Sequence, residues 1–167
     1  MLRYGLCVVA LLLSGAAFAA ETPKSLGRFE TWDAFVQTDK SGKTAEVCYA
    51  VGHPAKAGAL KGRGKTYITV TNRPADKSNG VISVVAGYML KKNAPVRLEI
   101  GKEHIDLYAV DSAAWARDDK AVVNALSKGK SLSVLGSSAK DENVRDDYAL
   151  GGFPKALAAI NKACGLH

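Results

Sequence analysis

The segment GRGKT at residues 62–66 comes closest to a motif with chemistry attached. Its end matches a phosphate-binding loop, in which glycine backbone amides surround a phosphate and a lysine contacts it. The spacing fails, because the motif needs a glycine where this chain has Ala59, and a helix where the residue pattern predicts a strand. We therefore predict a flexible basic loop at this place and no nucleotide site.

The basic side chains of this loop suggest a different chemistry, the binding of an anionic partner. Lys61, Arg63 and Lys65 lie close together among glycines, and the whole chain carries a formal net charge of +7. A basic protein often binds nucleic acid, but an exported one meets anionic lipid headgroups, polysaccharide or the acidic face of a protein. We predict an anionic-partner site at these three residues and no nucleic-acid partner. A solvated loop without a partner is the alternative.

The residues that could act as nucleophiles or bases show no arrangement typical of an enzyme. Ser137 and Ser138 lie in the segment LGSSAK, which does not have the complete glycine pattern of a nucleophile elbow. The histidines at positions 53, 104 and 167 have no serine or cysteine nucleophile beside them in the sequence. Potential metal ligands show no recognisable spacing either. We therefore predict a non-enzymatic protein without catalytic residues, metal or cofactor.

The aromatic residues are spread along the chain at about one for each expected element. Even spacing is typical of core side chains and does not favour a binding platform. The residues concerned are Trp32, Phe35, Tyr49, Tyr67, Tyr88, Tyr108, Trp115 and Tyr148.

Residues 1–19 have the pattern of a cleavable secretory signal. Arg3 supplies a positive charge, residues 6–13 are apolar, and small residues at Ala17 and Ala19 fit a signal peptidase site. The apolar run is shorter than the roughly 20 residues that span a bilayer. We predict cleavage after Ala19, a periplasmic or secreted product, and no membrane span in the mature chain.

The mature chain would retain two cysteines, Cys48 and Cys164, because Cys7 leaves with the signal. Two cysteines in an oxidising compartment indicate one disulfide. Such a bridge closes a long loop, for which the chain-entropy model gives about 4 to 5 kcal/mol of stabilisation. Two unpaired buried cysteines are the alternative, and a metal site would have too few ligands.

Most of the chain has the pattern of β-strands, with apolar and polar residues in alternation and turn signals between segments. Gly101 and Lys102 separate two such segments, which suits a tight hairpin. The expected strands are residues 44–51, 65–71, 81–86, 96–100, 104–110 and 131–135.

Two segments near the C-terminus have helical spacing instead. A short helix is expected after the capping residue Asp118, with Gly129 as its end. A second helix begins near Phe153 and places apolar residues, including Cys164, on one stripe. Consecutive strands with late helices favour an antiparallel sandwich over a parallel sheet. No linker divides residues 20–167, which we predict to form a single domain.

The order of several short motifs resembles the invasion-associated locus B family of exported proteobacterial proteins. The matching parts are GYMLK at residues 87–91, Trp115 with Ala116, and the pattern LGGF-x-x-AL-x-x-I-x-x-x-C at residues 150–164. The resemblance covers nearly all of the mature chain. One departure follows Ser138, where family members often continue with a basic residue and glycine and this chain has Ala-Lys-Asp.

The resemblance implies a mainly β fold, an immunoglobulin-like antiparallel β-sandwich with a short helix and a C-terminal helix. It also implies that the family's two cysteines pair, which are Cys48 and Cys164 here. No catalytic residues come with the family. Its name points to host-cell entry.

From the residues and the resemblance together we predict a non-enzymatic periplasmic or secreted interaction protein of the cell envelope, with a role in host-cell entry or envelope function. Its partner would be a protein or an anionic envelope component. One alternative is a small-molecule carrier or hydrolase with a pocket beside the C-terminal helix, beneath Trp115 and Tyr148. Another is a structural protein that supports envelope stability.

Overall fold

The structure is a computed structural model that describes residues 22–140 and 142–166, so the expected signal at residues 1–19 lies outside the described residues. The described chain forms ten strands, two α-helices and one 3-10 turn. The strands are β1 (Lys24–Phe29), β2 (Trp32–Thr38), β3 (Ala45–Gly52), β4 (Tyr67–Arg73), β5 (Ser78–Val85), β6 (Val96–Ile100), β7 (Glu103–Val110), β8 (Ala113–Trp115), β9 (Ser131–Ser137) and β10 (Asn143–Ala149). The helices are α1 (Asp119–Lys128) and α2 (Phe153–Ala163), and the 3-10 turn is Pro74–Asp76.

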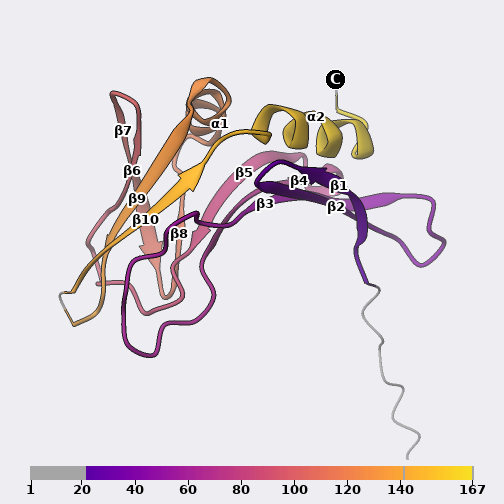
Figure 1. Cartoon of the computed structure of the whole chain (residues 1–167). Coiled ribbons are helices and arrows are strands. Elements are labelled where there is room, and N and C mark those ends of the chain that lie inside the picture. The colour runs from indigo at the N-terminus through magenta and orange to yellow at the C-terminus, as the bar shows by residue number, and fades with distance from the viewer. Residues whose placement is uncertain (1–21, 141, 167) are drawn as a thin grey trace, which may run out of the picture.

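The ten strands form one continuous antiparallel sheet in the order β1-β2-β3-β4-β5-β8-β7-β6-β9-β10. Strand β7 joins its two halves, because residues 103–107 pair with β6 and residues 108–110 pair with β8. Figure 1 shows the half that contains β1 to β5 lying at an angle to the half that contains β6, β9 and β10. The expected mainly β, antiparallel fold class is confirmed, and its ten strands form one sheet whose two halves are joined through β7.

The local signals explain most of these elements. Gly101 and Lys102 form the two-residue connection of the β6–β7 hairpin, as expected, and Gly101 has the positive φ of 60° that tight hairpins need. Asp118 caps α1 by accepting a hydrogen bond from the amide of Ala121 at 2.9 Å. Gly129 ends that helix. The strand ranges predicted from the sequence patterns do not include β1, β2, β8 or β10, which are all present.

Helix α2 covers one face of β1 to β4 (Figure 1). At the centre of this interface the rings of Trp32 and Phe153 meet edge to face, with centroids 4.8 Å apart, and both residues are fully buried. The expected disulfide between Cys48 and Cys164 is confirmed, and it links β3 to the end of α2 across 116 residues of sequence. Packing and the covalent bond together fix the C-terminal helix on the sheet.

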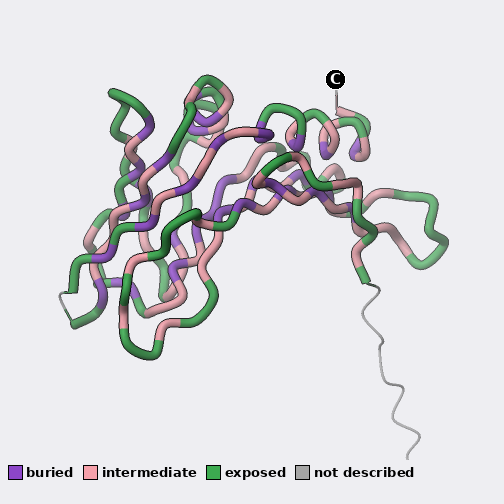
Figure 2. Tube along the Cα trace, in the orientation of Figure 1, coloured by how far each residue is buried: buried purple, intermediate pink, exposed green. Residues whose placement is uncertain are grey.

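Strand β10 lies at an edge of the sheet, and the chain after β3 covers part of this edge. Ala55 donates its amide to the carbonyl of Asp147 at 2.8 Å, and Asp147 donates to the carbonyl of Lys56 at 2.8 Å. These bonds fix one end of the long connection between β3 and β4, residues 53–66, which we call the basic loop. Figure 2 shows that the basic loop is mostly exposed or half-buried.

Candidate docking surface

The guanidinium of Arg63 in the basic loop is turned inward and bound on several sides. It contacts both carboxylate oxygens of Asp146 in β10, at 2.7 and 2.6 Å. It also donates to the carbonyls of Gly58 and Ala86, each at 2.9 Å. The side chain is only 7% exposed, so the expectation that Arg63 binds an external anion needs correction. Its charge serves to hold the loop against β10, because Asp146 already supplies the anion.

The surroundings of this ion pair perturb several groups. The hydrogen bonds that Arg63 donates to Asp146 raise the pKa of Arg63 above its usual value. Burial raises the pKa of Tyr148, next to Asp146 in the same cluster, to about 12. Burial also raises the pKa of Tyr88, whose ring lies 5.1 Å from the Arg63 guanidinium carbon. The buried side chains of Arg63, Asp146 and Tyr148 form a polar cluster beneath the loop.

The two lysines of the predicted site lie differently from Arg63. Lys61 and Lys65 are exposed on the basic loop on either side of the buried guanidinium. The amide of Gly64 donates to the carbonyl of Gly87 at 2.8 Å, which places Lys65 beside the segment that follows β5. Lys61 and Lys65 therefore remain candidates for an anionic partner on a loop that is held from both sides.

Several aromatic residues expected in the core lie instead on the outer face of the sheet, opposite the buried face. The prediction is correct for Trp32 and Tyr148, which are buried, and wrong for Tyr108 and Trp115, which are 39% and 36% exposed. Tyr108 and Trp115 are direct cross-strand partners on β7 and β8. The rings lie on the face opposite Ala114, which is fully buried.

Exposed apolar side chains gather around this aromatic pair. Val110, two positions after Tyr108, is on the same face of β7 and is 49% exposed. Met89, which is 55% exposed, precedes Leu90, whose amide donates to the carbonyl of Asp111 at 2.8 Å. We call the side chains of Met89, Tyr108, Val110 and Trp115 the hairpin patch.

The chemistry of the hairpin patch is that of a binding surface. Exposed large apolar side chains that cluster in one place mark interaction sites more often than isolated ones do. Met, Tyr, Trp and Arg are the residues enriched at interface cores, and Arg117 adds a guanidinium 5.1 Å from the centre of the Tyr108 ring. Sequence patterns do not predict this site, because alternation alone does not tell which face of a strand is buried.

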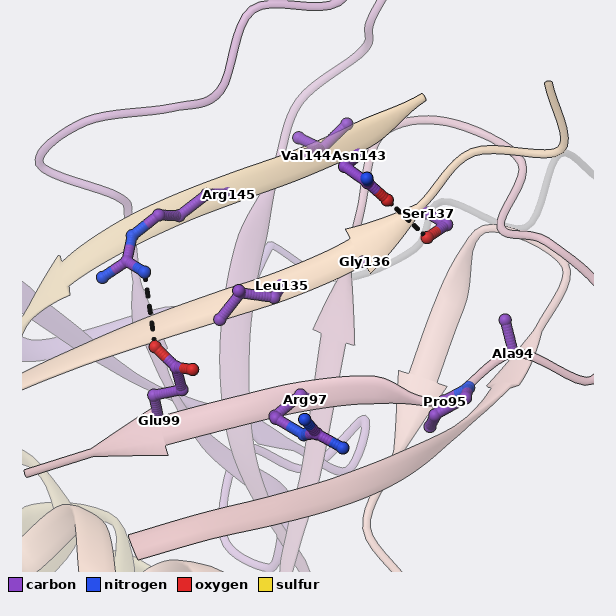
Figure 3. Close-up of a pocket in the computed structure, with 10 residues that line it drawn as sticks. All are labelled: Ala94, Pro95, Arg97, Glu99, Leu135, Gly136, Ser137, Asn143, Val144 and Arg145. Atoms are coloured by element: carbon purple, nitrogen blue, oxygen red, sulfur yellow. Dashed lines mark hydrogen bonds and ion pairs between the residues drawn. The ribbon is translucent and has the colours of Figure 1, made fainter. Parts of the chain in front are cut away.

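A groove of about 470 Å³ lies on the outer face of β6, β9 and β10 (Figure 3). Its two arginines already contact carboxylates: Arg97 contacts Asp106 at 3.0 Å, and Arg145 contacts Glu99 at 3.3 Å. In Figure 3 the Arg145 side chain lies along the strand toward Glu99. This internal pairing compensates the cationic groups of the groove.

The interface between the sheet and α2 gives no support to the alternative of a carrier or hydrolase. Most side chains packed there are apolar and buried, with one polar contact in which Asn72 of β4 donates to Asn161 of α2 at 2.8 Å. Trp115 lies on the outer face, on strand β8, which pairs with β5 and β7. An open hollow of about 380 Å³ lies at the start of α2, and its described lining has Lys130 and Lys155 but no Ser, His, Cys or carboxylate. Across residues 22–140 and 142–166, no cluster of three or more potential metal ligands occurs.

The fold and the surface together define a disulfide-linked, mainly β domain with an exposed apolar patch on its outer face. The chain belongs to the family described as Invasion associated locus B (IalB) protein, which matches residues 32–161. It is also similar in fold to the crystal structure of invasion associated protein B from Bartonella henselae, with a TM-score of 0.55 and 22% sequence identity over 85% of this chain and 99% of that chain. No curated protein matches the sequence. No helix in the described part of the chain has the length and hydropathy to cross a membrane.

Proposed function

We propose that this protein is a non-enzymatic interaction protein of the cell envelope, periplasmic or secreted, which binds its partner through the hairpin patch. Membership of the IalB family supports this proposal, and so does the Cys48–Cys164 disulfide, because disulfides persist in oxidising compartments. The signal pattern at residues 1–19 is the further reason to place it outside the cytoplasm.

The observation that carries the proposal is the grouping of exposed apolar side chains. Among the described residues, the large hydrophobic side chains that are exposed are those of Met89, Tyr108, Val110 and Trp115, all in the hairpin patch. Monomeric proteins rarely keep such side chains together on their surface without using them. Rings and a methionine on one face can supply the central contacts of an interface.

The proposed function includes a biological role. The similar protein from Bartonella henselae is described as invasion associated, and the family carries this word in its name. For this chain we propose a role in host-cell entry or in envelope function, with Lys61 and Lys65 as the cationic part of the binding surface. A purely structural role in the envelope would leave the patch without a partner.

Site-specific photo-crosslinking in intact cells tests the proposal. A photoreactive phenylalanine replaces Trp115 or, as the matched control, exposed Lys155 on α2. We expect crosslinked envelope material from position 115 and none from position 155. Equal yields from both positions, or none from position 115, would contradict the proposal.

Intact mass spectrometry of the protein purified from its native envelope fraction tests the compartment. We expect a chain that begins at Ala20 and is two hydrogens lighter than its fully reduced form, with the Cys48 and Cys164 peptides linked. An uncleaved chain with free thiols would remove the support for export.

A further inference from the structure

Four connections that are distant in the sequence lie side by side at one end of the molecule. The amide of Gly64 donates to Gly87 and that of Leu90 to Asp111, each at 2.8 Å, while Leu90 and Ser138 form a β-bridge. We call residues 60–65, 87–92, 111–112 and 138–140 the loop end. In Figure 1 the basic loop extends on the side of the molecule away from α1 and α2.

The exposed charges of the loop end are mainly positive. The charge of Arg63 is compensated by Asp146 and does not contribute. The acidic side chains described at or beside this end are Asp111 and Glu142. The exposed lysines there include Lys61, Lys65, Lys92 and Lys140.

Apolar side chains project from the same end. Met89 lies in the connection after β5, and Val110 is the last residue of β7, directly before the turn at Asp111. Both are about half exposed, and Tyr108 and Trp115 continue the apolar surface along the outer face. The hairpin patch and the lysines therefore adjoin each other.

We infer that the loop end docks on the anionic phospholipid surface of a membrane. Met89 and Val110 enter the headgroup region, the rings of Tyr108 and Trp115 lie at its border, and Lys61 and Lys65 contact headgroup phosphates. Apolar tips surrounded by lysines are the surface chemistry that interfacial binding requires. This inference rests on the proposed function and names the partner of the same surface.

Charge complementarity and geometry favour a lipid surface over a second copy of this chain or another protein. A second copy would present the same lysines, and like charges would oppose its docking. The cations lie on separate connections around apolar tips, an arrangement that fits a laterally fluid layer of phosphates better than a fixed set of carboxylates. The anchoring of the basic loop on Asp146 and Gly87 reduces the ordering cost of binding.

Sedimentation of the disulfide-bonded chain, residues 20–167, with lipid vesicles tests the inference. One set of vesicles is pure phosphatidylcholine, and the other contains about one-third phosphatidylglycerol, which supplies the anionic charge. We expect binding to the second set alone, with a blue shift of Trp115 fluorescence, since Trp32 is already fully buried. Raising the salt concentration should weaken the binding through screening.

Matched variants distinguish an effect of the loop end from an effect of net charge. Replacement of both Lys61 and Lys65 by Gln should weaken vesicle binding about 25-fold, since each lysine contributes about fivefold. The control replaces exposed Lys155 and Lys162 on α2 by Gln, with the same change in charge, and should bind as before. Met89→Ser should weaken binding to the same vesicles without any change in charge.

The inference is wrong if the protein shows no preference for vesicles that contain phosphatidylglycerol, or if the α2 control variant weakens binding as much as the loop variant does. It is also wrong if soluble dextran sulfate displaces the protein from vesicles and binds Met89→Ser as tightly as it binds the wild type. These results are distinguishable from failure of the proposed function. If vesicles do not bind while position 115 still crosslinks to an envelope protein, the patch is a protein-binding surface and the lipid assignment is wrong. If position 115 also gives no crosslink, the proposed function fails as well.

Discussion

Arg63 and Asp146, which are 83 residues apart in the sequence, form a two-pronged ion pair beneath the basic loop. Their closest nitrogen and oxygen atoms are 2.6 Å apart, and the side chains are 7% and 4% exposed. Asp146 also accepts a hydrogen bond from the amide of Gly58 at 2.9 Å, so one carboxylate organises two points of the loop. The pair determines where the exposed lysines of the loop are presented.

We expect Asp146→Asn to destabilise the fold by about 3 to 5 kcal/mol, because it leaves the charge of Arg63 buried without a counter-charge. The control is Asp106→Asn, which breaks the pair with Arg97, where both side chains are half exposed. That change should cost no more than about 1 kcal/mol. Urea unfolding, monitored by circular dichroism, measures the free energy of unfolding of both variants. Equal losses would show that the buried pair contributes no more to stability than the exposed pair does.

Removal of the Cys48–Cys164 disulfide should cost about 4 to 5 kcal/mol, because the bond restricts a loop of 116 residues in the unfolded chain. The urea midpoint of the wild-type protein should fall when a reductant is added. The double variant Cys48→Ser with Cys164→Ser should show the lower midpoint in both conditions. A wild-type midpoint that ignores the reductant would mean that packing of α2 alone holds the C-terminus.

Local sequence patterns predicted the elements whose signals are self-contained. The cap at Asp118 and the turn at Gly101 depend on residues within a few positions, and both are present as expected. Strand β10 was missed because Asp146 occupies an inward position between Val144 and Tyr148 and interrupts the apolar alternation. That carboxylate is tolerated in the interior only because Arg63 pairs with it.

The surface site could not be predicted from local sequence patterns, because it depends on contacts between residues that are far apart in the sequence. Arg63 resembles its neighbours Lys61 and Lys65 in charge, and only the long-range contact with Asp146 separates its role from theirs. Trp115 alternates like a core residue, but it lies on the face of β8 opposite Ala114, which is fully buried. Which face of a strand is buried depends on packing between elements far apart in the sequence, so residue type alone could not decide it.

The stability of the fold should decrease at alkaline pH because of Tyr148. Its pKa is raised from 10.0 to about 12, mainly by burial, so the folded state keeps the phenol protonated where the unfolded state ionises. The stabilisation is fully present below pH 10 and is lost as the pH rises through about 12. We expect a change of about 2 to 3 kcal/mol over this interval.

The variant Tyr148→Phe isolates this contribution, since it keeps the ring and removes the ionisable hydroxyl. The hydroxyl lies 3.3 Å from the Thr66 hydroxyl, so the variant should be slightly less stable near neutral pH. Melting temperatures measured from pH 8 to about 12 should fall less steeply for the variant than for the wild type. Parallel curves would assign the alkaline loss to other groups.

The position of the basic loop should depend on Gly87. Its φ is 77°, and a Cβ atom there would lie 2.6 Å from the carbonyl oxygen of Gly64, a backbone atom. Gly62 is the matched control, because its φ is 74° but a Cβ atom there would meet nothing within 4 Å. Both changes to Ala carry the cost of a left-handed backbone, roughly 1 to 2 kcal/mol, but only Gly87→Ala also displaces the loop.

The rate of limited digestion with trypsin measures this displacement, since the enzyme cleaves after the basic residues of the loop, Lys61, Arg63 and Lys65. The hydrogen bond between Gly64 and Gly87 and the pairing of Arg63 restrict access in the wild type. We expect faster cleavage in Gly87→Ala than in Gly62→Ala when each variant is digested at the same number of degrees below its own melting temperature. If both variants are cleaved at the same rate, the contact at Gly87 does not hold the loop, and the anchoring of Lys61 and Lys65 depends on Asp146 alone.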